Sequence, residues 1–179
     1  MDYLDFLSNG GTDFKGRTLE SIWSFTDQQI ERTHDFVQII FPLDKPSQST
    51  FHGHYLDSKD TINKIKDSLI AKDNILKSSK WYFSFLKRNI WLWNRKYDHN
   101  QLRITRVIEC LRLLVSDDEA NKFYEDVFEI IKDDNKINET SLNFWNKAQL
   151  FIFYGSLKIS STLHSNVFAI FNARTVEGT

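Results

Sequence analysis

The sequence predicts an all-α fold in a single domain that covers residues 1–179. Proline (two) and glycine (six) are scarce, which favours long helices over a turn-rich β fold. Apolar residues also recur at spacings of three and four in several stretches, as they do on the buried faces of helices. The stretch His99–Leu114 is apolar over most of its helical circumference. A helix of that kind must be packed on most sides, so we expect a bundle of about six to eight helices around it.

The predicted central helix carries one apolar arc, which Leu102, Cys110 and Leu113 extend around the next side. The arc consists of Ile104, Val107, Ile108, Leu111 and Leu114. A clean polar strip, expected to face solvent, consists of Gln101, Thr105, Glu109 and Arg112.

Two arginines, Arg103 and Arg106, fall in the apolar sector of this helix. Because an unpaired buried charge costs several kcal/mol, each needs a carboxylate or carbonyl partner. The nearest acidic candidates are Glu20, Glu31 and Asp35. Truncating either arginine is therefore predicted to destabilise the fold by about 3–5 kcal/mol. The same change at Arg112, on the polar strip, should stay within about 0.5 kcal/mol.

The remaining helices follow from spacing and from end signals. Short helices are predicted over Asp2–Leu7 and Thr18–Phe25. A longer helix over Asp27–Phe41 is started by a capping box of Thr26 with Gln29 and stopped by Pro42.

After the loop that follows Pro42, one long helix is predicted from Ser58 through Leu86, with a polar break near 78–79. The stretch 89–98 connects it to the central helix. A capping box of Ser116 with Glu119 starts a helix that reaches Ile131. A further helix runs from about Thr140 to Tyr154, where Gly155 stops it, and 149–179 is expected to form a helical extension.

Polar residues lie at the borders of both the 27–41 helix and the central helix. If these helices pack on each other, the polar groups meet and form a candidate ligand-binding site. The site comprises Glu31, His34, Asp35, Gln38, His99, Asn100, Arg103 and Arg106. It would present histidine and arginine to an anionic or amide-bearing ligand, such as a peptide carboxylate. Two alternatives remain open: a purely structural buried network, and an enzyme that uses His34 and His99 as acid–base groups.

No metal ion or cofactor is expected. Glu31 and His34 have the E-x-x-H spacing of di-iron bundles, but the chain lacks a second copy of that motif. His52 and His54 lie in a loop without a nearby third ligand. Cys110, in the middle of an apolar helix, is expected to serve packing. We expect elemental analysis to find no stoichiometric transition metal.

The net charge gives no general reason to expect nucleic acid as a partner, because the chain has 23 basic and 24 acidic residues. The stretch Lys77–Tyr97 interleaves six basic with seven aromatic residues, yet most of the aromatics have core spacing, so we do not expect it to bind nucleic acid. The single cysteine is typical of a reducing compartment. The sequence shows neither a signal-peptide pattern nor an apolar run long enough to span a membrane. We therefore expect a cytoplasmic protein without a transmembrane segment. Peripheral association with a membrane stays open.

Three stretches resemble a known family. Gly16–Ser47, GRTLESIWSFTDQQIERTHDFVQIIFPLDKPS, is similar to the first signature of the opioid growth factor receptor conserved domain. His99–Leu114 with Glu119–Ile130 resembles the second, and Thr140–Ala148, with Trp145, the third. The resemblance covers about 3–148, and Ile39 departs from the tryptophan that is usual there. It implies a binding or interaction module with a peptide or protein ligand, since the animal namesake is described as a receptor for an enkephalin-type peptide.

Overall fold

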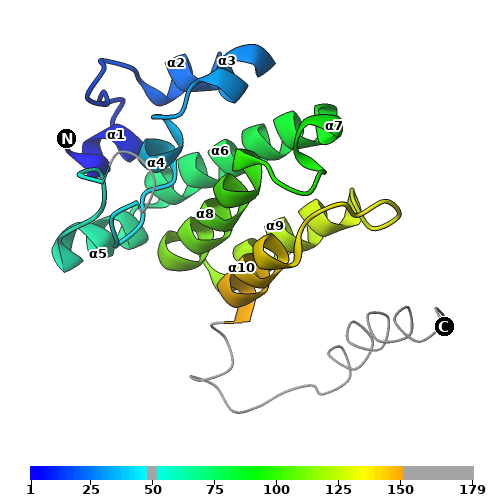
Figure 1. Cartoon of the computed structure of the whole chain (residues 1–179). Coiled ribbons are helices and arrows are strands. Elements are labelled where there is room, and N and C mark those ends of the chain that lie inside the picture. Colours follow the sequence, from blue (N-terminus) through cyan, green and yellow to red (C-terminus); the bar gives the residue numbers. More distant parts are fainter. Residues whose placement is uncertain (48–51, 151–179) are drawn as a thin grey trace, which may run out of the picture.

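A computed structural model describes residues 1–47 and 52–150 of the chain (Figure 1). Within those residues the chain forms ten helices and no strand, which confirms the all-α prediction and exceeds the predicted six to eight helices. The helices are α1 (Tyr3–Ser8), α2 (Leu19–Trp23), α3 (Asp27–Arg32), α4 (Val37–Ile40), α5 (Lys59–Asp67), α6 (Leu69–Arg88), α7 (Ile90–Trp93), α8 (His99–Leu114), α9 (Asp117–Glu129) and α10 (Glu139–Leu150). Residues 151–179, including the predicted stop at Gly155, lie outside the described part.

Helix α8 is the central element, with the bounds that the sequence predicts. It contacts α9 and α10 most extensively, and also α5, α6 and α7 (Figure 1). Its start is fixed by Asp98, whose carboxylate accepts a hydrogen bond from the Asn100 backbone N–H at 2.8 Å. The predicted apolar arc is buried: Ile104, Val107, Ile108, Leu111 and Leu114 are each at most 1 % exposed. Packing on several sides is what an almost wholly apolar helix requires.

The polar strip of α8 does not face solvent as predicted. Gln101 is 1 % exposed and the Arg112 side chain is 11 % exposed. The Arg112 guanidinium donates to the Ala148 carbonyl on α10 at 2.6 Å, to Asp117 at 2.7 Å and to Asn121 at 2.9 Å. Helix α10 and its neighbours therefore cover this strip at Gln101 and Arg112, whereas Thr105 and Glu109 remain partly exposed. Conversely, Leu102, assigned to the apolar sector, is 56 % exposed.

The predicted helix over 27–41 is broken into α3 and α4. Its capping box is confirmed, since Thr26 and Gln29 exchange the two expected hydrogen bonds. The helix nevertheless ends at Arg32, because Thr33 takes an extended conformation (φ −90°, ψ 121°). Arg103 of α8 donates to the carbonyl oxygens of Ile30 and Thr33. These are carbonyls that a continuing helix would have used itself. A tertiary contact thus replaces the missing helical hydrogen bonds.

The predicted long helix from 58 to 86 is also two helices, but the break lies at Ser68 and not near 78–79. Ser68 is extended (φ −83°, ψ 111°) and its hydroxyl caps α6 by accepting from the Ala71 N–H. Ser78 and Ser79 remain helical and buried, because their hydroxyls donate to the carbonyls of Asn74 and Leu76 on the preceding turn. The polar residues at 78–79 are thus satisfied inside a continuous helix.

The connection over 89–98 contains the short helix α7, which places a large aromatic side chain in the core. Trp93 is fully buried and donates through Nε1 to the Leu86 carbonyl at 2.8 Å. Helices α9 and α10 begin close to their predicted starts.

The Ser116 hydroxyl caps α9 by accepting from the Glu119 N–H, and α10 begins at Glu139. Trp145 on α10 is 1 % exposed. The core is therefore continuous from α1 to α10.

Candidate functional site

Seven of the eight predicted polar residues meet where α3 and α4 approach the first half of α8, and they form two groups that share Arg103; the eighth, Asp35, lies elsewhere. The first is a closed network around Arg103, which is 7 % exposed. Its guanidinium donates to the Ile30 carbonyl at 3.0 Å, to the Thr33 carbonyl at 2.8 Å and to the Asn100 amide oxygen at 3.1 Å. Arg103 therefore locks the α3–α4 turn onto α8.

Asn100 connects this network to the core. Its amide oxygen also accepts from the Tyr82 hydroxyl at 2.8 Å, and its amide nitrogen donates to Glu31 at 2.9 Å. Burial raises the pKa of Tyr82 well above its usual value, so the phenol remains a donor. Asn100 is fully buried, and satisfied buried polar groups of this kind fix the packing of the elements that carry them. For Glu31, Asn100 and Arg103 the geometry is that of a structural network.

Asp35 lies apart from both arginines of α8, contrary to its place among the nearest acidic partners. It is 2 % exposed and pairs with Lys15 and with Arg17, the latter at 2.9 Å. Burial alone would raise the pKa of Asp35, but the hydrogen bonds from Lys15 and Arg17 outweigh burial and lower it. Because the helix breaks at Thr33, Asp35 turns toward the 13–17 loop instead of α8.

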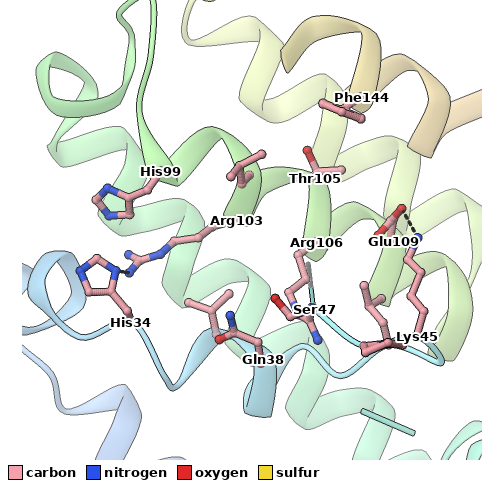
Figure 2. A pocket seen from close by; sticks show the side chains of 14 residues that line it. His34, Gln38, Lys45, Ser47, His99, Arg103, Thr105, Arg106, Glu109 and Phe144 are labelled. Atoms are coloured by element: carbon pink, nitrogen blue, oxygen red, sulfur yellow. Dashed lines mark hydrogen bonds and ion pairs between the residues drawn. The ribbon is translucent and has the colours of Figure 1, made fainter. Parts of the chain in front are cut away.

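The second group lines a cavity of about 510 Å³ beside α8 (Figure 2). Four predicted residues belong to it together with Arg103: His34, Gln38, His99 and Arg106. The remaining lining residues are Val37, Leu43, Lys45, Pro46, Ser47, Leu102, Thr105, Glu109 and Phe144. Figure 2 shows the side chains of His34, Gln38 and Arg103 on one side of the site and that of Phe144 on the opposite side. A cavity of this size is within the range of small-molecule sites.

Arg106 is the least satisfied cation of the site. Its Nε donates to the Phe41 carbonyl at 2.8 Å, whereas its Nη2 is buried and has no hydrogen-bond partner among the described residues. Burial lowers the pKa of Arg106 from its very high ordinary value, yet a guanidinium stays charged at neutral pH. An unmet donor on a buried charge is costly, so an acceptor entering here would relieve that cost.

Two imidazoles stand together at one end of the cavity. The rings of His34 and His99 are 5.2 Å apart in an edge-to-face arrangement, and His99 Nε2 lies 3.6 Å from a Glu31 oxygen. Burial lowers the pKa of His99 below 6.5, and the charges of Arg103 and His34 act in the same direction against the carboxylates of Glu31 and Asp98. His99 is thus neutral at pH 7.

A pH dependence of stability follows from His99. Because its folded-state pKa lies below the 6.5 of an unperturbed histidine, the unfolded chain binds the proton first as the pH falls. We expect the free energy of unfolding to decrease below about pH 6.5, and His99→Gln to make this decrease shallower. Urea denaturation of both proteins between neutral and mildly acidic pH measures the effect. The same slope in wild type and variant would contradict the assignment to His99.

Lys45 and Glu109 lie where the cavity adjoins a second one of about 580 Å³. Their side chains form an ion pair at 2.7 Å, and both residues line both cavities. The second cavity continues along α8 toward Arg112 and Leu113. Sequence reasoning missed Lys45 because it lies in a loop without a motif. It missed Glu109 because that residue was assigned to a solvent-facing strip.

Glu31, Asp98 and His99 have the spacing of a metal site, because each offers one ligand atom within 4.8 Å of the others. These carboxylates already have partners, since Asp98 caps α8 and pairs with Arg95, and Glu31 accepts from Asn100. The Arg103 cation also adjoins the group. The expectation of no stoichiometric transition metal therefore stays a prediction, and one equivalent of zinc in elemental analysis would reverse it.

The E-x-x-H pair, His54 and Cys110 lie in surroundings that favour structural roles. Glu31 and His34 do not share a helix, because α3 ends at Arg32. His54 stacks on Phe14 at 4.4 Å. Cys110 is fully buried, and burial raises its pKa to about 12, which suppresses the reactive thiolate.

The basic–aromatic stretch over 77–97 contributes mainly to the core. Tyr82, Phe85 and Trp93 are fully buried, whereas Trp91 and Tyr97 are 72 % and 71 % exposed. Trp81 and Phe83 are partly buried against the core, so five of the seven aromatics pack there and the core spacing of most of them is confirmed. Of the helices that the structure describes, none combines the length and the apolar character needed to cross a membrane.

Comparisons of this chain with protein-family models, curated proteins and solved structures found no match. The resemblance to the opioid growth factor receptor conserved domain therefore stays a prediction.

Proposed function

We propose that this chain is a binding module and that its anionic ligand, such as the carboxylate of a peptide or of a small molecule, binds in the 510 Å³ cavity beside α8. The observation that carries the proposal is the charge of the lining. Three cationic side chains, Lys45, Arg103 and Arg106, line the cavity together with the imidazoles of His34 and His99. Glu109 is the single acidic lining residue among those described, and Lys45 already pairs with it. Such a cavity attracts anions.

The two arginines contribute differently. Arg103 uses its donors within the protein, so it supplies positive potential without needing a ligand. Arg106 keeps a donor atom without a partner in the described residues, so it is the group that a carboxylate would complete. Neither arginine forms an ion pair with a carboxylate of the described chain. The site therefore holds two positive charges that a ligand can offset.

The family resemblance supports the same cavity. All of its lining residues lie in the three stretches that carry the resemblance: residues 34–47 in Gly16–Ser47, residues 99–109 in His99–Leu114 and Phe144 in Thr140–Ala148. The similarity to a receptor domain thus concerns the walls of this cavity and not only the core. This is why a binding role is preferred over a purely structural network for the residues outside the Arg103 cluster.

Calorimetric titration tests the proposal with two probes, an enkephalin-type pentapeptide with a free carboxyl terminus and inorganic phosphate. We expect at least one probe to bind, and Arg106→Gln to weaken its binding by about tenfold or more, the equivalent of ~1.4 kcal/mol. Arg32→Gln is the matched control, because Arg32 is exposed on α3 and outside the cavity. Thermal melts verify that each variant is folded. No binding at millimolar concentration, or equal binding by wild type and Arg106→Gln, would refute the proposal.

The enzyme alternative rests on His34 and His99, which adjoin at the cavity. One of them is neutral at pH 7 and has the residue type of a general base. No described residue next to them is placed as an activated nucleophile, so the binding role has the stronger support.

A further inference from the structure

Exposed apolar side chains stand next to the cationic part of the cavity. Leu102 and Phe144 line it and are 56 % and 46 % exposed. They come from different helices, α8 and α10, and face the same space. Deeper in, the cavity is bordered by Val37 and Leu43, which are almost fully buried. Large apolar groups gathered at a concave surface indicate a ligand with an apolar part.

The polar and apolar walls are carried by neighbouring residues of α8. Leu102 and Arg106 are four residues apart, so their side chains lie on the same face about one turn from each other. A ligand that contacts both therefore needs an acidic group and an apolar body that are directly joined. Neither a wholly polar anion nor a neutral apolar molecule uses both walls.

We infer that the ligand is an amphiphilic acid, whose carboxylate pairs with Arg106 while its apolar body packs against Leu102 and Phe144. This inference rests on the proposed function and specifies the class of its ligand. A fatty acid and the carboxyl-terminal residue of a peptide with an apolar side chain share this chemistry. The Arg106 Nη2 atom is cut off from solvent, so its side chain or its cover shifts slightly when the carboxylate binds.

Three small probes separate the contributions of the acid and of the apolar body. Octanoate has both parts, octanamide lacks the charge and acetate lacks the apolar body. Calorimetric titration is expected to show octanoate binding about tenfold or more tightly than either of the others. N-acetylphenylalanine and its amide, measured in the same way, report whether a peptide terminus is preferred to an alkyl chain.

Two variants test whether Arg106 and Leu102 cause these differences in affinity. Arg106→Gln should remove the preference for octanoate over octanamide. Leu102→Ser should weaken octanoate about tenfold and leave acetate unchanged. The matched controls are Arg32→Gln and Leu69→Ser, since Leu69 is 74 % exposed on α6 and outside this cavity. Thermal melts confirm that the variants are folded.

The outcomes distinguish this inference from the proposed function. Equal affinities for octanoate and octanamide, or for octanoate and acetate, would overturn the amphiphilic acid. So would a loss of octanoate binding in Leu69→Ser as large as that in Leu102→Ser. If phosphate or acetate binds through Arg106 as tightly as octanoate does, the proposed function stands and this inference falls. If no anion binds, both fall.

Discussion

Arg103→Ala should lower the free energy of unfolding by about 3–5 kcal/mol. The substitution removes the donors for the carbonyls of Ile30 and Thr33 and one donor for Asn100. Each buried acceptor left without a partner costs roughly 1–3 kcal/mol. Chemical denaturation followed by circular dichroism measures the loss. Arg103→Lys should restore little of it, because one ammonium cannot reproduce the fork geometry that reaches both carbonyls.

The control for this prediction is Arg32→Ala. Arg32 ends α3 and is exposed, so its removal should change stability by no more than about 0.5 kcal/mol. Arg106→Ala should cost less than Arg103→Ala, because Arg106 has one carbonyl partner and an unmet donor. The sequence alone assigned the two arginines the same cost. If Arg103→Ala proved as mild as Arg32→Ala, the α3–α4 turn would not depend on this contact.

Gln101→Ala should destabilise the fold by about 3 kcal/mol, although the sequence assigns Gln101 to a solvent-facing strip. Its amide nitrogen donates to the carbonyls of Trp93 and Arg95, at 3.1 and 2.6 Å. Its amide oxygen accepts from Ser141 at 2.7 Å and from Asn138 at 3.1 Å. Truncation leaves the Arg95 carbonyl and the Ser141 hydroxyl hydrogen without these partners, each at roughly 1–3 kcal/mol. Urea denaturation of the variant gives the value.

Leu102→Ala is the matched comparison for Gln101→Ala, because the two residues are adjacent on α8. Leu102 is 56 % exposed, so its truncation should cost no more than about 0.5 kcal/mol. The polar residue is then the more important of the pair for stability, which reverses the usual order. If Leu102→Ala were the more damaging of the two, the assigned packing of α10 and of the 93–98 connection against α8 would be wrong.

The fold class and the central helix could be predicted from the sequence because they depend on local composition and period. An apolar arc that runs through Ile104, Leu111 and Leu114 needs burial wherever the rest of the chain lies. End signals are similarly local. Asp98 and Thr26 cap their helices by hydrogen bonds within three residues. These features require no knowledge of which segment packs against which.

The candidate site was predictable only in part. It could be expected that His34 and Gln38 line the same site as Arg106, because both the 27–41 segment and α8 carry polar residues at the edge of a buried apolar face. The division into a closed network and an open cavity could not. It depends on the helix break at Thr33, where the residue sequence shows no proline or glycine. The partner of the carbonyls freed there is Arg103, seventy positions further along the chain.

The sequence by itself determined that the chain is helical, that 99–114 is its central helix and that Arg103 needs buried partners. Tertiary structure decided which partners it has, since carbonyl oxygens become available only when α3 ends. It also decided which strip of α8 is covered, because Gln101 and Arg112 are satisfied by α10, its preceding loop and the 93–98 connection. Helical periodicity states which side chains share a face, but a polar face can be buried whenever neighbouring segments supply its hydrogen bonds.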